Sequence, residues 1–247
     1  MTSYARQAIK VVKATPRKEG PAVVYRALPS SEIGFIDPFL ALGEFAMPVE
    51  NSGFGFHPHR GVEFITYQLD GQLRHRDPAG TELTIAAGEA IHLMAGKFME
   101  HSEMPVGKEQ SHGMQLWVDL PLKDKSAPHT YKRAGIQDIP EQTANGAIVR
   151  TIASETGPLT LHIPSVYLDI TLKGSISFSY PLPENWNAFV QVLSGSGKFG
   201  STGVPGAQHD LVLLGKGATV DVMAISPLRF LLLAARPNNE GGRGMFG

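Results

Sequence analysis

The chain carries the sequence FHPHRG at residues 56–61 and HSEMP at residues 101–105. Each motif places two metal-binding side chains two positions apart, His57 with His59 and His101 with Glu103. In a β-strand, alternate side chains lie on the same face, with their Cα atoms roughly 6.5–7 Å apart. Two such pairs on facing strands would form a site of three imidazoles and one carboxylate. Pro58 cannot donate a ladder hydrogen bond, which favours a strand end or barrel mouth for the first pair.

Turn residues separate short apolar segments throughout this region. They recur roughly every 8–12 residues, and no long segment with a period of 3.6 residues intervenes, which is typical of a β-sandwich or barrel. Upstream, residues 8–13 and 23–26 alternate and predict two strands joined by a turn-rich link from Pro16 to Gly20. The turns that support this interpretation are Asp70-Gly71, Asp77-Pro78-Ala79-Gly80, Ala87-Gly88 and Ala95-Gly96.

The second half repeats the pattern of strand, glycine turn and strand. Strands are expected over residues 149–152, 159–163, 167–172, 189–193, 211–214 and 230–235. We infer an internal duplication and an all-β fold of two barrels in tandem. The expected domains are residues 1–122 and 123–237, the second beginning in a polar linker over 122–128. Residues 238–247, rich in Gly and Asn, are expected to form a flexible tail.

Composition excludes several classes of function. The 247 residues have a formal net charge of −1 with acids and bases interspersed, which argues against direct nucleic-acid binding and a polybasic membrane patch. With no cysteine, thiolate catalysis, disulfides and Cys-based zinc sites are excluded. No run of about 18 apolar residues appears, and the N-terminal segment lacks a signal-peptide core. The expectation is a soluble, cytoplasmic protein without membrane contact.

Other polar residues are candidates for supporting or lining the site. We expect His75 to pair with Asp77, and His92 to be a satisfied core or pocket-lining histidine. His112 could lie behind a ligand. For Glu63, a hydrogen bond to a ligand imidazole and a pair with Arg60 are equally open. Further candidates for the pocket are Phe56, Met94, Phe98, Gln115 and Trp117; for Met94, Gln115 and Trp117 core packing is the alternative.

The ligand set leaves the metal open. Imidazole suits iron, copper, nickel and zinc. Three histidines and a glutamate could close a tetrahedral, structural zinc site. The same four ligands on a six-coordinate iron would leave two positions for water, oxygen or substrate. These ligands alone do not decide between the metals.

The motifs together resemble those of pirin and the pirin-like proteins, over about residues 8–236. The resemblance implies two tandem cupin barrels, of the double-stranded β-helix or jelly-roll type: a bicupin. It also implies iron in the N-terminal barrel only, on His57, His59, His101 and Glu103. Fe(II) is therefore the leading expectation for the metal, with Zn, Cu, Ni or Mn as alternatives. The C-terminal barrel has no His-x-His, and we expect it to be metal-free. The segments that carry the resemblance are 37–40, 57–63, 67–71, 75–77, 94–96, 101–105, 115–121, 187–190 and 230–234.

Two kinds of function follow from the resemblance. Some pirin-like proteins open the flavonol quercetin with O2, as quercetin 2,3-dioxygenases. In that reaction Glu103 would be catalytic, taking the proton of the substrate 3-hydroxyl as a general base. The partners would then be a small aromatic substrate and O2. The alternative is a non-enzymatic, iron-dependent redox sensor or transcriptional co-regulator acting through protein partners, which in a eukaryote would be nuclear.

The sequence departs from the family pattern in two places. Residues 97–100 are bulkier than usual, and His92 replaces a more typical aromatic residue; both changes could narrow the pocket mouth or alter its polarity. Family members also carry a C-terminal helix after the last strands. Here the chain passes from Arg236-Pro237 almost directly to Gly241-Gly242, so we expect the surface under that helix to be open or covered by another chain.

Overall fold

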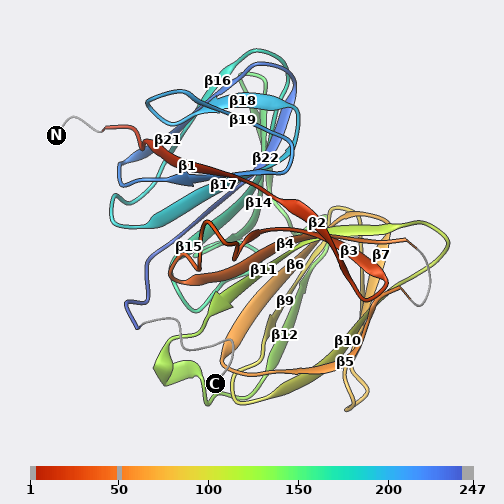
Figure 1. The fold of residues 1–247 in the computed structure, drawn as a ribbon. Helices are drawn as coiled ribbons and strands as arrows, with labels where there is room; N and C mark the ends of the chain where they lie inside the picture. The colour runs from red at the N-terminus through yellow and green to blue at the C-terminus, as the bar shows by residue number, and fades with distance from the viewer. Residues whose placement is uncertain (1–3, 49–51, 241–247) are drawn as a thin grey trace. The chain divides into compact units, whose positions relative to one another are not determined.

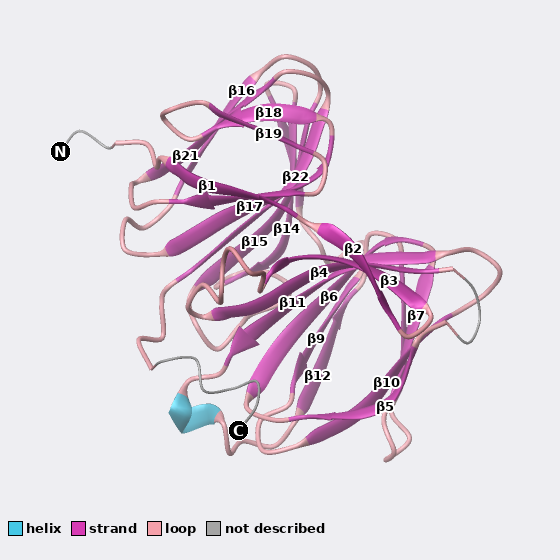
Figure 2. Ribbon diagram, in the orientation of Figure 1, coloured by secondary structure: helices cyan, strands magenta, loops and turns pink. Residues whose placement is uncertain are grey.

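Antiparallel strands make up nearly all of the regular structure in the computed structural model, which describes residues 4–48 and 52–240 (Figure 1). The helical element described is a single 3₁₀ turn, η1 (Leu122–Asp124), drawn in cyan in Figure 2. Within those residues, no helix has the length and apolar character needed to traverse a lipid bilayer. The chain divides into two compact units, which we call the N-terminal and the C-terminal barrel.

The N-terminal barrel comprises Thr15–Ile139 and residues 238–240. Its seven-stranded sheet has the order β12-β9-β6-β11-β4-β3-β2, and its four-stranded sheet the order β5-β10-β7-β8. The strands are β2 (Thr15–Glu19), β3 (Ala22–Leu28), β4 (Phe39–Met47), β5 (Phe54–His59), β6 (Val62–Asp70), β7 (Gln72–Arg76), β8 (Glu82–Ala86), β9 (Ala90–Met94), β10 (Met99–Pro105), β11 (Ser111–Asp119) and β12 (Thr130–Ala134).

The C-terminal barrel comprises residues 4–14 and Pro140–Pro237. Its two sheets have the orders β1-β20-β17-β22-β15-β14-β13 and β16-β21-β18-β19. The strands are β1 (Ala8–Lys13), β13 (Glu141–Ala144), β14 (Ala147–Ser154), β15 (Ser165–Leu172), β16 (Ser177–Pro181), β17 (Asn187–Ser194), β18 (Ser196–Phe199), β19 (Val204–Ala207), β20 (Asp210–Leu214), β21 (Thr219–Ala224) and β22 (Leu228–Ala235).

The two barrels repeat one strand order, so the duplication inferred from the sequence has a structural counterpart. The run β9-β6-β11-β4-β3-β2 corresponds to β20-β17-β22-β15-β14-β13, and β5-β10-β7-β8 corresponds to β16-β21-β18-β19. The tight turns after β6 and β17 also correspond. Gly71 and Gly195 have φ of +68° and +78°, and an added Cβ would lie 2.2 Å and 1.9 Å from a backbone oxygen. Both turns therefore require glycine.

The unit boundaries differ from those expected from the sequence, residues 1–122, 123–237 and 238–247. Strand β1 precedes the N-terminal barrel in the chain but pairs with β20 of the C-terminal barrel. Strand β12, beyond residue 122, pairs with β9. Each of these strands provides backbone hydrogen-bond partners at the edge of a sheet. The hydrophobic pattern of a strand does not show which sheet edge it joins. In addition, Thr15–Glu19 is a strand rather than a link, and residues 159–163 form no strand.

The expected flexible tail is only partly within the described residues, because residues 241–247 lie outside them. Its first three residues are held by the N-terminal barrel. The backbone N–H groups of Asn238 and Asn239 donate to the Asp37 carboxylate at 2.9 and 2.8 Å. The Glu240 carboxylate accepts from the backbone N–H of Leu122 at 2.7 Å.

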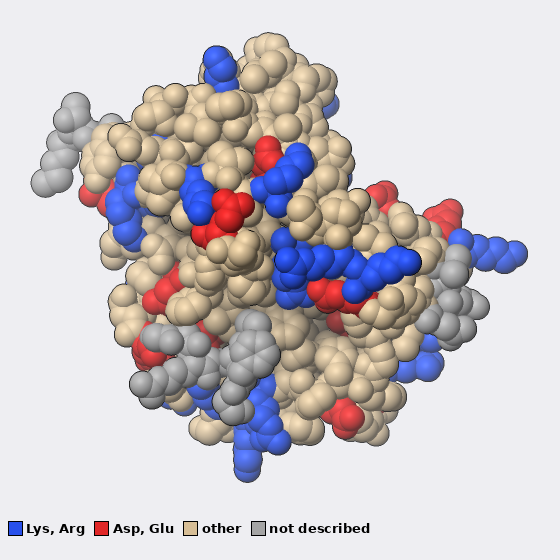
Figure 3. All heavy atoms as spheres, viewed as in Figure 1, with Lys and Arg blue, Asp and Glu red and all other residues tan. Residues whose placement is uncertain are grey.

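Each barrel has its own core, formed by the inward-facing residues of its large and small sheets. In the N-terminal barrel, Phe64, Leu73 and Met99 come from β6, β7 and β10 and are all buried. In the C-terminal barrel, Val190, Phe199 and Phe230 play the same part. On the face drawn in Figure 3, acidic and basic side chains are interspersed.

Candidate metal centre

Three histidines converge where β5 lies antiparallel to β10. His57 is directly opposite His101 in the ladder, and His59 is opposite Met99. The ring centroids of His57, His59 and His101 lie 4.5–4.9 Å apart. One nitrogen from each ring falls within 4.8 Å of the others. Because alternation places His57 and His59 on one side of β5, the strand period brings both imidazoles to the same point.

The nitrogens of this cluster fit a cation. The Nδ1–H of His57 donates to the backbone oxygen of Gly55 at 2.6 Å, which leaves the Nε2 lone pair free. The Nε2 atoms of His59 and His101 are buried and have no hydrogen-bond partner within the part of the chain described. Buried polar atoms without partners are costly, and three convergent imidazole lone pairs would be satisfied by one transition-metal ion.

Burial favours the neutral form of His59 and His101. Burial and, to a lesser extent, the neighbouring His57 lower the pKa of His59 to about 4. Burial also lowers the pKa of His101 well below its ordinary value, with contributions from His57, His59 and His75. A neutral imidazole can bind a metal without first losing a proton. The low pKa values therefore favour metal binding near neutral pH.

His75 is the main member of the site that the sequence did not predict. Its Nδ1 lies 3.0 Å from Nδ1 of His101, and its side chain is buried. We expected His75 to pair with Asp77, but the Asp77 carboxylate accepts hydrogen bonds from the Tyr131 hydroxyl at 2.7 Å and the Thr81 backbone N–H at 2.8 Å. The reason is the register of β7 on β10, which places His75 opposite Glu103 and turns it toward the cluster.

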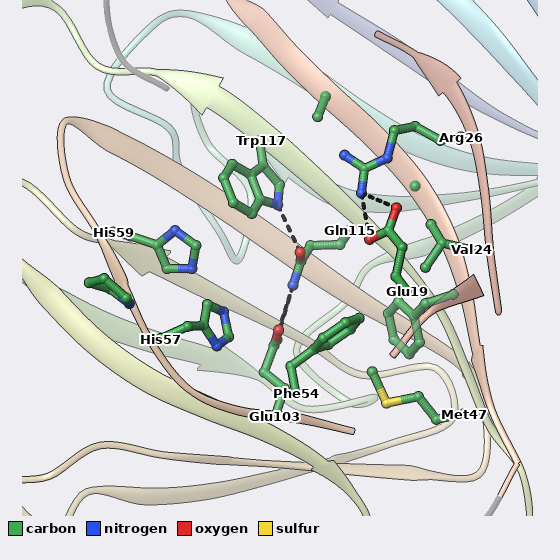
Figure 4. Close-up of a pocket in the computed structure, with 14 residues that line it drawn as sticks. Glu19, Val24, Arg26, Met47, Phe54, His57, His59, Glu103, Gln115 and Trp117 are labelled. Atoms are coloured by element: carbon green, nitrogen blue, oxygen red, sulfur yellow. Dashed lines mark hydrogen bonds and ion pairs between the residues drawn. The ribbon is translucent and has the colours of Figure 1, made fainter. Parts of the chain in front are cut away.

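Glu103 lies beside the histidines, but it does not belong to the group of three residues whose ligand atoms lie within 4.8 Å of one another. Its buried carboxylate accepts hydrogen bonds from Gln115 Nε2, at 3.0 and 2.9 Å, and from the Thr66 hydroxyl at 3.4 Å. Trp117 Nε1 donates to Gln115 Oε1 at 2.7 Å and so orients the amide toward Glu103 (Figure 4). Burial raises the pKa of Glu103, while the hydrogen bonds from Gln115 and Thr66 oppose the increase.

A cavity of about 430 Å³ opens beside the histidines. Its wall is formed by inward-facing residues from both sheets, and those on β4 (residues 41, 43, 45 and 47) alternate as the strand period requires. Figure 4 shows His57 and His59 on one side of the cavity and Arg26 and Glu19 on the other. The hydrogen-bonded side chains of Trp117, Gln115 and Glu103 lie between them. The lining residues are Glu19, Val24, Arg26, Ala41, Gly43, Phe45, Met47, Phe54, His57, Pro58, His59, Glu103, Gln115 and Trp117.

Two aromatic candidates for the pocket lie outside this lining. Phe56 is 55% exposed. Phe98 is 41% exposed, and the Arg60 guanidinium lies 4.7 Å from the centre of its ring. Gln115 and Trp117, by contrast, line the cavity as expected from their place in the barrel interior.

The remaining candidates are placed elsewhere in the N-terminal barrel. His92 Nε2 donates to Glu63 at 2.9 Å, a buried pair that neither alternative for Glu63 anticipated. Met94 is buried at the end of β9 and is not among the lining residues described. His112 donates to Glu44 at 2.9 Å and to Asp70 at 3.2 Å. These two acids raise the pKa of His112; it forms an ion-pair cluster rather than supporting a ligand.

Two barrels that repeat one arrangement of sheets define a two-domain cupin protein, a bicupin. The family profile described as pirin matches residues 23–118, and that of the pirin C-terminal cupin domain matches residues 167–242. The chain therefore belongs to the pirin family. The expected family and the all-β bicupin fold are both confirmed.

Individual relatives agree with this assignment. A pirin-like protein from Solanum lycopersicum is 40% identical over 96% of this chain and 84% of its own length. The structure of a quercetin 2,3-dioxygenase from Acinetobacter baumannii is similar with a TM-score of 0.87 at 26% identity, over 95% of this chain and 88% of that chain. A bacterial pirin from Escherichia coli in complex with nickel(II) has a TM-score of 0.76 at 20% identity, over 95% and 98%, which shows a shared fold.

Proposed function

We propose that this protein is an Fe(II)-dependent dioxygenase that opens a flavonol such as quercetin. The observation that carries the proposal is the convergence of His57, His59 and His101 beside a cavity of about 430 Å³, which His57 and His59 line. That volume falls within the range of about 300–1,000 Å³ typical of small-molecule sites. Similarity to the Acinetobacter baumannii quercetin 2,3-dioxygenase, at 26% identity, supports the substrate class.

The three imidazoles would hold the metal. When bound, Fe(II) would supply a Lewis acid for a substrate oxygen and a redox partner for O2. His57 and His101 are fixed for this task, since the Nδ1 of each has a hydrogen-bond partner that orients the ring. Glu103, which accepts hydrogen bonds from Gln115, would be a fourth ligand through a lone pair that those bonds do not use.

The other side chains of the cavity would bind and prepare the substrate. In this proposal a Glu103 carboxylate oxygen accepts the proton of the flavonol 3-hydroxyl, and Gln115 holds the carboxylate in place for that transfer. Phe45, Phe54 and Trp117 provide flat apolar walls for an aromatic ring system. These walls also exclude water from the reacting oxygens.

Oxygen uptake tests the proposal. Metal-free protein is loaded with one equivalent of Fe(II) without air, mixed with quercetin, and then exposed to O2 while O2 and quercetin are measured. We expect both to be consumed together and in proportion to bound iron. The controls are the same protein loaded with Zn(II), which cannot change oxidation state, and iron-treated His101→Ala. No consumption above the zinc control by iron-loaded wild type would contradict the proposed substrate.

A further inference from the structure

An ion pair lies in the cavity on the side remote from the histidines. Arg26 Nη2 is 3.0 Å from both carboxylate oxygens of Glu19. Both side chains line the cavity, where Glu103 supplies the other carboxylate among the lining residues described (Figure 4). The pair comes from β2 and β3, the hairpin at the edge of the large sheet.

The guanidinium of Arg26 has donors to spare. Glu19 occupies only Nη2, and the buried Nε–H has no hydrogen-bond partner within the described chain. A buried donor without a partner is unfavourable, and the arginine fork is suited to bind a carboxylate through two parallel hydrogen bonds. Arg26 can therefore bind an anion through donors that Glu19 does not use.

The surrounding wall leaves room for such an anion. Arg26 is directly opposite Gly43 of β4 in the ladder, and Ala41 and Gly43 are the two smallest lining residues. The side chains of Arg26 and Glu19 are 29% and 34% exposed. Because Glu19 reaches solvent, its carboxylate can be displaced without becoming a buried, unpaired charge.

We infer that Arg26 is a specificity-determining residue that binds a carboxylate at the distal end of the substrate, and that Glu19 competes for it. The favoured substrate would be an aromatic compound with metal-binding oxygens at one end and an acidic group at the other. The metal-binding end of this description rests on the proposed function. The acidic end rests on the ion pair and the cavity alone.

The competition predicts opposite effects for the two halves of the pair. Arg26→Gln should weaken binding of an acidic probe, because it removes the cation. Glu19→Gln should tighten it, because it removes the competing carboxylate. A purely structural ion pair predicts that either substitution loosens the hairpin and weakens binding. The sign of the Glu19→Gln effect therefore separates the two accounts.

The test is a calorimetric measurement of Kd with Zn(II)-loaded protein, so that no turnover is needed. The probes are a neutral flavonol and the same flavonol bearing a carboxylate on its exocyclic phenyl ring. We expect Arg26→Gln to raise the Kd of the carboxylate probe by about tenfold or more, which is the effect of losing a hydrogen bond to a charged group. The same substitution should change the Kd of the neutral probe by no more than about twofold. Glu19→Gln should tighten only the carboxylate probe.

The C-terminal barrel offers a matched control. Glu141 on β13 and Arg150 on β14 form an ion pair at 2.8 Å on the corresponding edge hairpin. Glu141→Gln and Arg150→Gln should change neither Kd. If Arg26→Gln lowers the thermal midpoint by more than these controls do, Arg26→Lys and Glu19→Gln supply the test instead.

The outcomes are distinct. The inference is overturned if Glu19→Gln and Arg26→Gln shift the acidic probe in the same direction, if both probes respond equally, or if wild type does not bind the acidic probe. An acidic probe that binds with the expected signs supports the inference even where quercetin is not turned over. In that case only the proposed function fails.

Discussion

The Nδ1 atoms of His75 and His101 lie 3.0 Å apart in the buried wall of the metal centre. Only one of the two can carry the proton. For His101 to offer its Nε2 lone pair to a metal, its Nδ1 must be protonated and donate to His75. With His75 as the acceptor, the contact would hold His101 in the tautomer that binds metal, as outer hydrogen bonds to ligating histidines generally do.

Loss of this acceptor should weaken metal binding without removing a ligand. His75→Leu is expected to raise the metal Kd by about 10–100-fold, the usual effect of removing a hydrogen bond behind a ligand. His75→Asn places an amide oxygen near the position of Nδ1 and should restore most of the affinity. Competition with a chelator measures both values. Equal losses in the two variants would show that packing, rather than the hydrogen bond, is responsible.

Removal of a ligand should abolish binding. His57→Ala, His59→Ala and His101→Ala should each lose most of the metal, which elemental analysis of the purified proteins would show. Metal that binds only the folded state stabilises it by about 3–4 kcal/mol at several hundred times Kd, so chelation should lower the thermal midpoint of wild type. The control is His129→Ala, because the ring of His129 lies outside the cluster and contacts the backbone oxygen of Phe98 at 3.3 Å. Full metal content in His101→Ala would refute the site.

Glu103 can be tested for proton transfer separately from metal binding. Glu103→Gln keeps a polar oxygen at this position but cannot accept a proton. It should retain metal and lower quercetin turnover per bound iron by about 10²–10⁴-fold, the usual contribution of a positioned general base. Glu89→Gln, which alters a buried acid paired with Arg133, is the control in the same barrel. Equal turnover per iron in wild type and Glu103→Gln would remove Glu103 as the base.

The His112 cluster predicts a pH-dependent stability. Hydrogen bonds to Glu44 and Asp70 raise the pKa of His112 above its ordinary value of 6.5. The protonated form is thus favoured in the folded state, and the stabilisation is fully present below about pH 6.5 and lost as the pH rises through the raised pKa. Urea unfolding should show that His112→Gln is more destabilising at about pH 6 than at about pH 9. A pH-independent difference would contradict the ion-pair assignment.

The sequence predicted the parts of the fold and site that depend on local periodicity. Alternation along a strand placed His57 and His59 on one side of β5, and the glycine turns marked the strand ends, as Gly71 illustrates. The resemblance to pirins supplied the bicupin arrangement. These features are encoded within short segments, so they can be read without knowing which strands are neighbours.

Features that depend on strand neighbours were missed. His75 reaches His101 only because β7 lies beside β10, a pairing between distant segments. Strand β1 joins the other barrel for a similar reason. The segment of Glu19 was interpreted as a link because Pro16 interrupts its pattern, although an edge strand tolerates proline. The ion pair between Glu19 and Arg26 therefore could not be predicted from the sequence.

The most direct test of the central claim is the fate of labelled oxygen. Iron-loaded protein is given quercetin under ¹⁸O₂, and the ring-opened product is examined by mass spectrometry alongside the zinc-loaded control. We predict that both atoms of one ¹⁸O₂ molecule enter the product, in an amount proportional to bound iron. Fully iron-loaded protein that leaves quercetin intact, or that yields product without the label, would contradict the account.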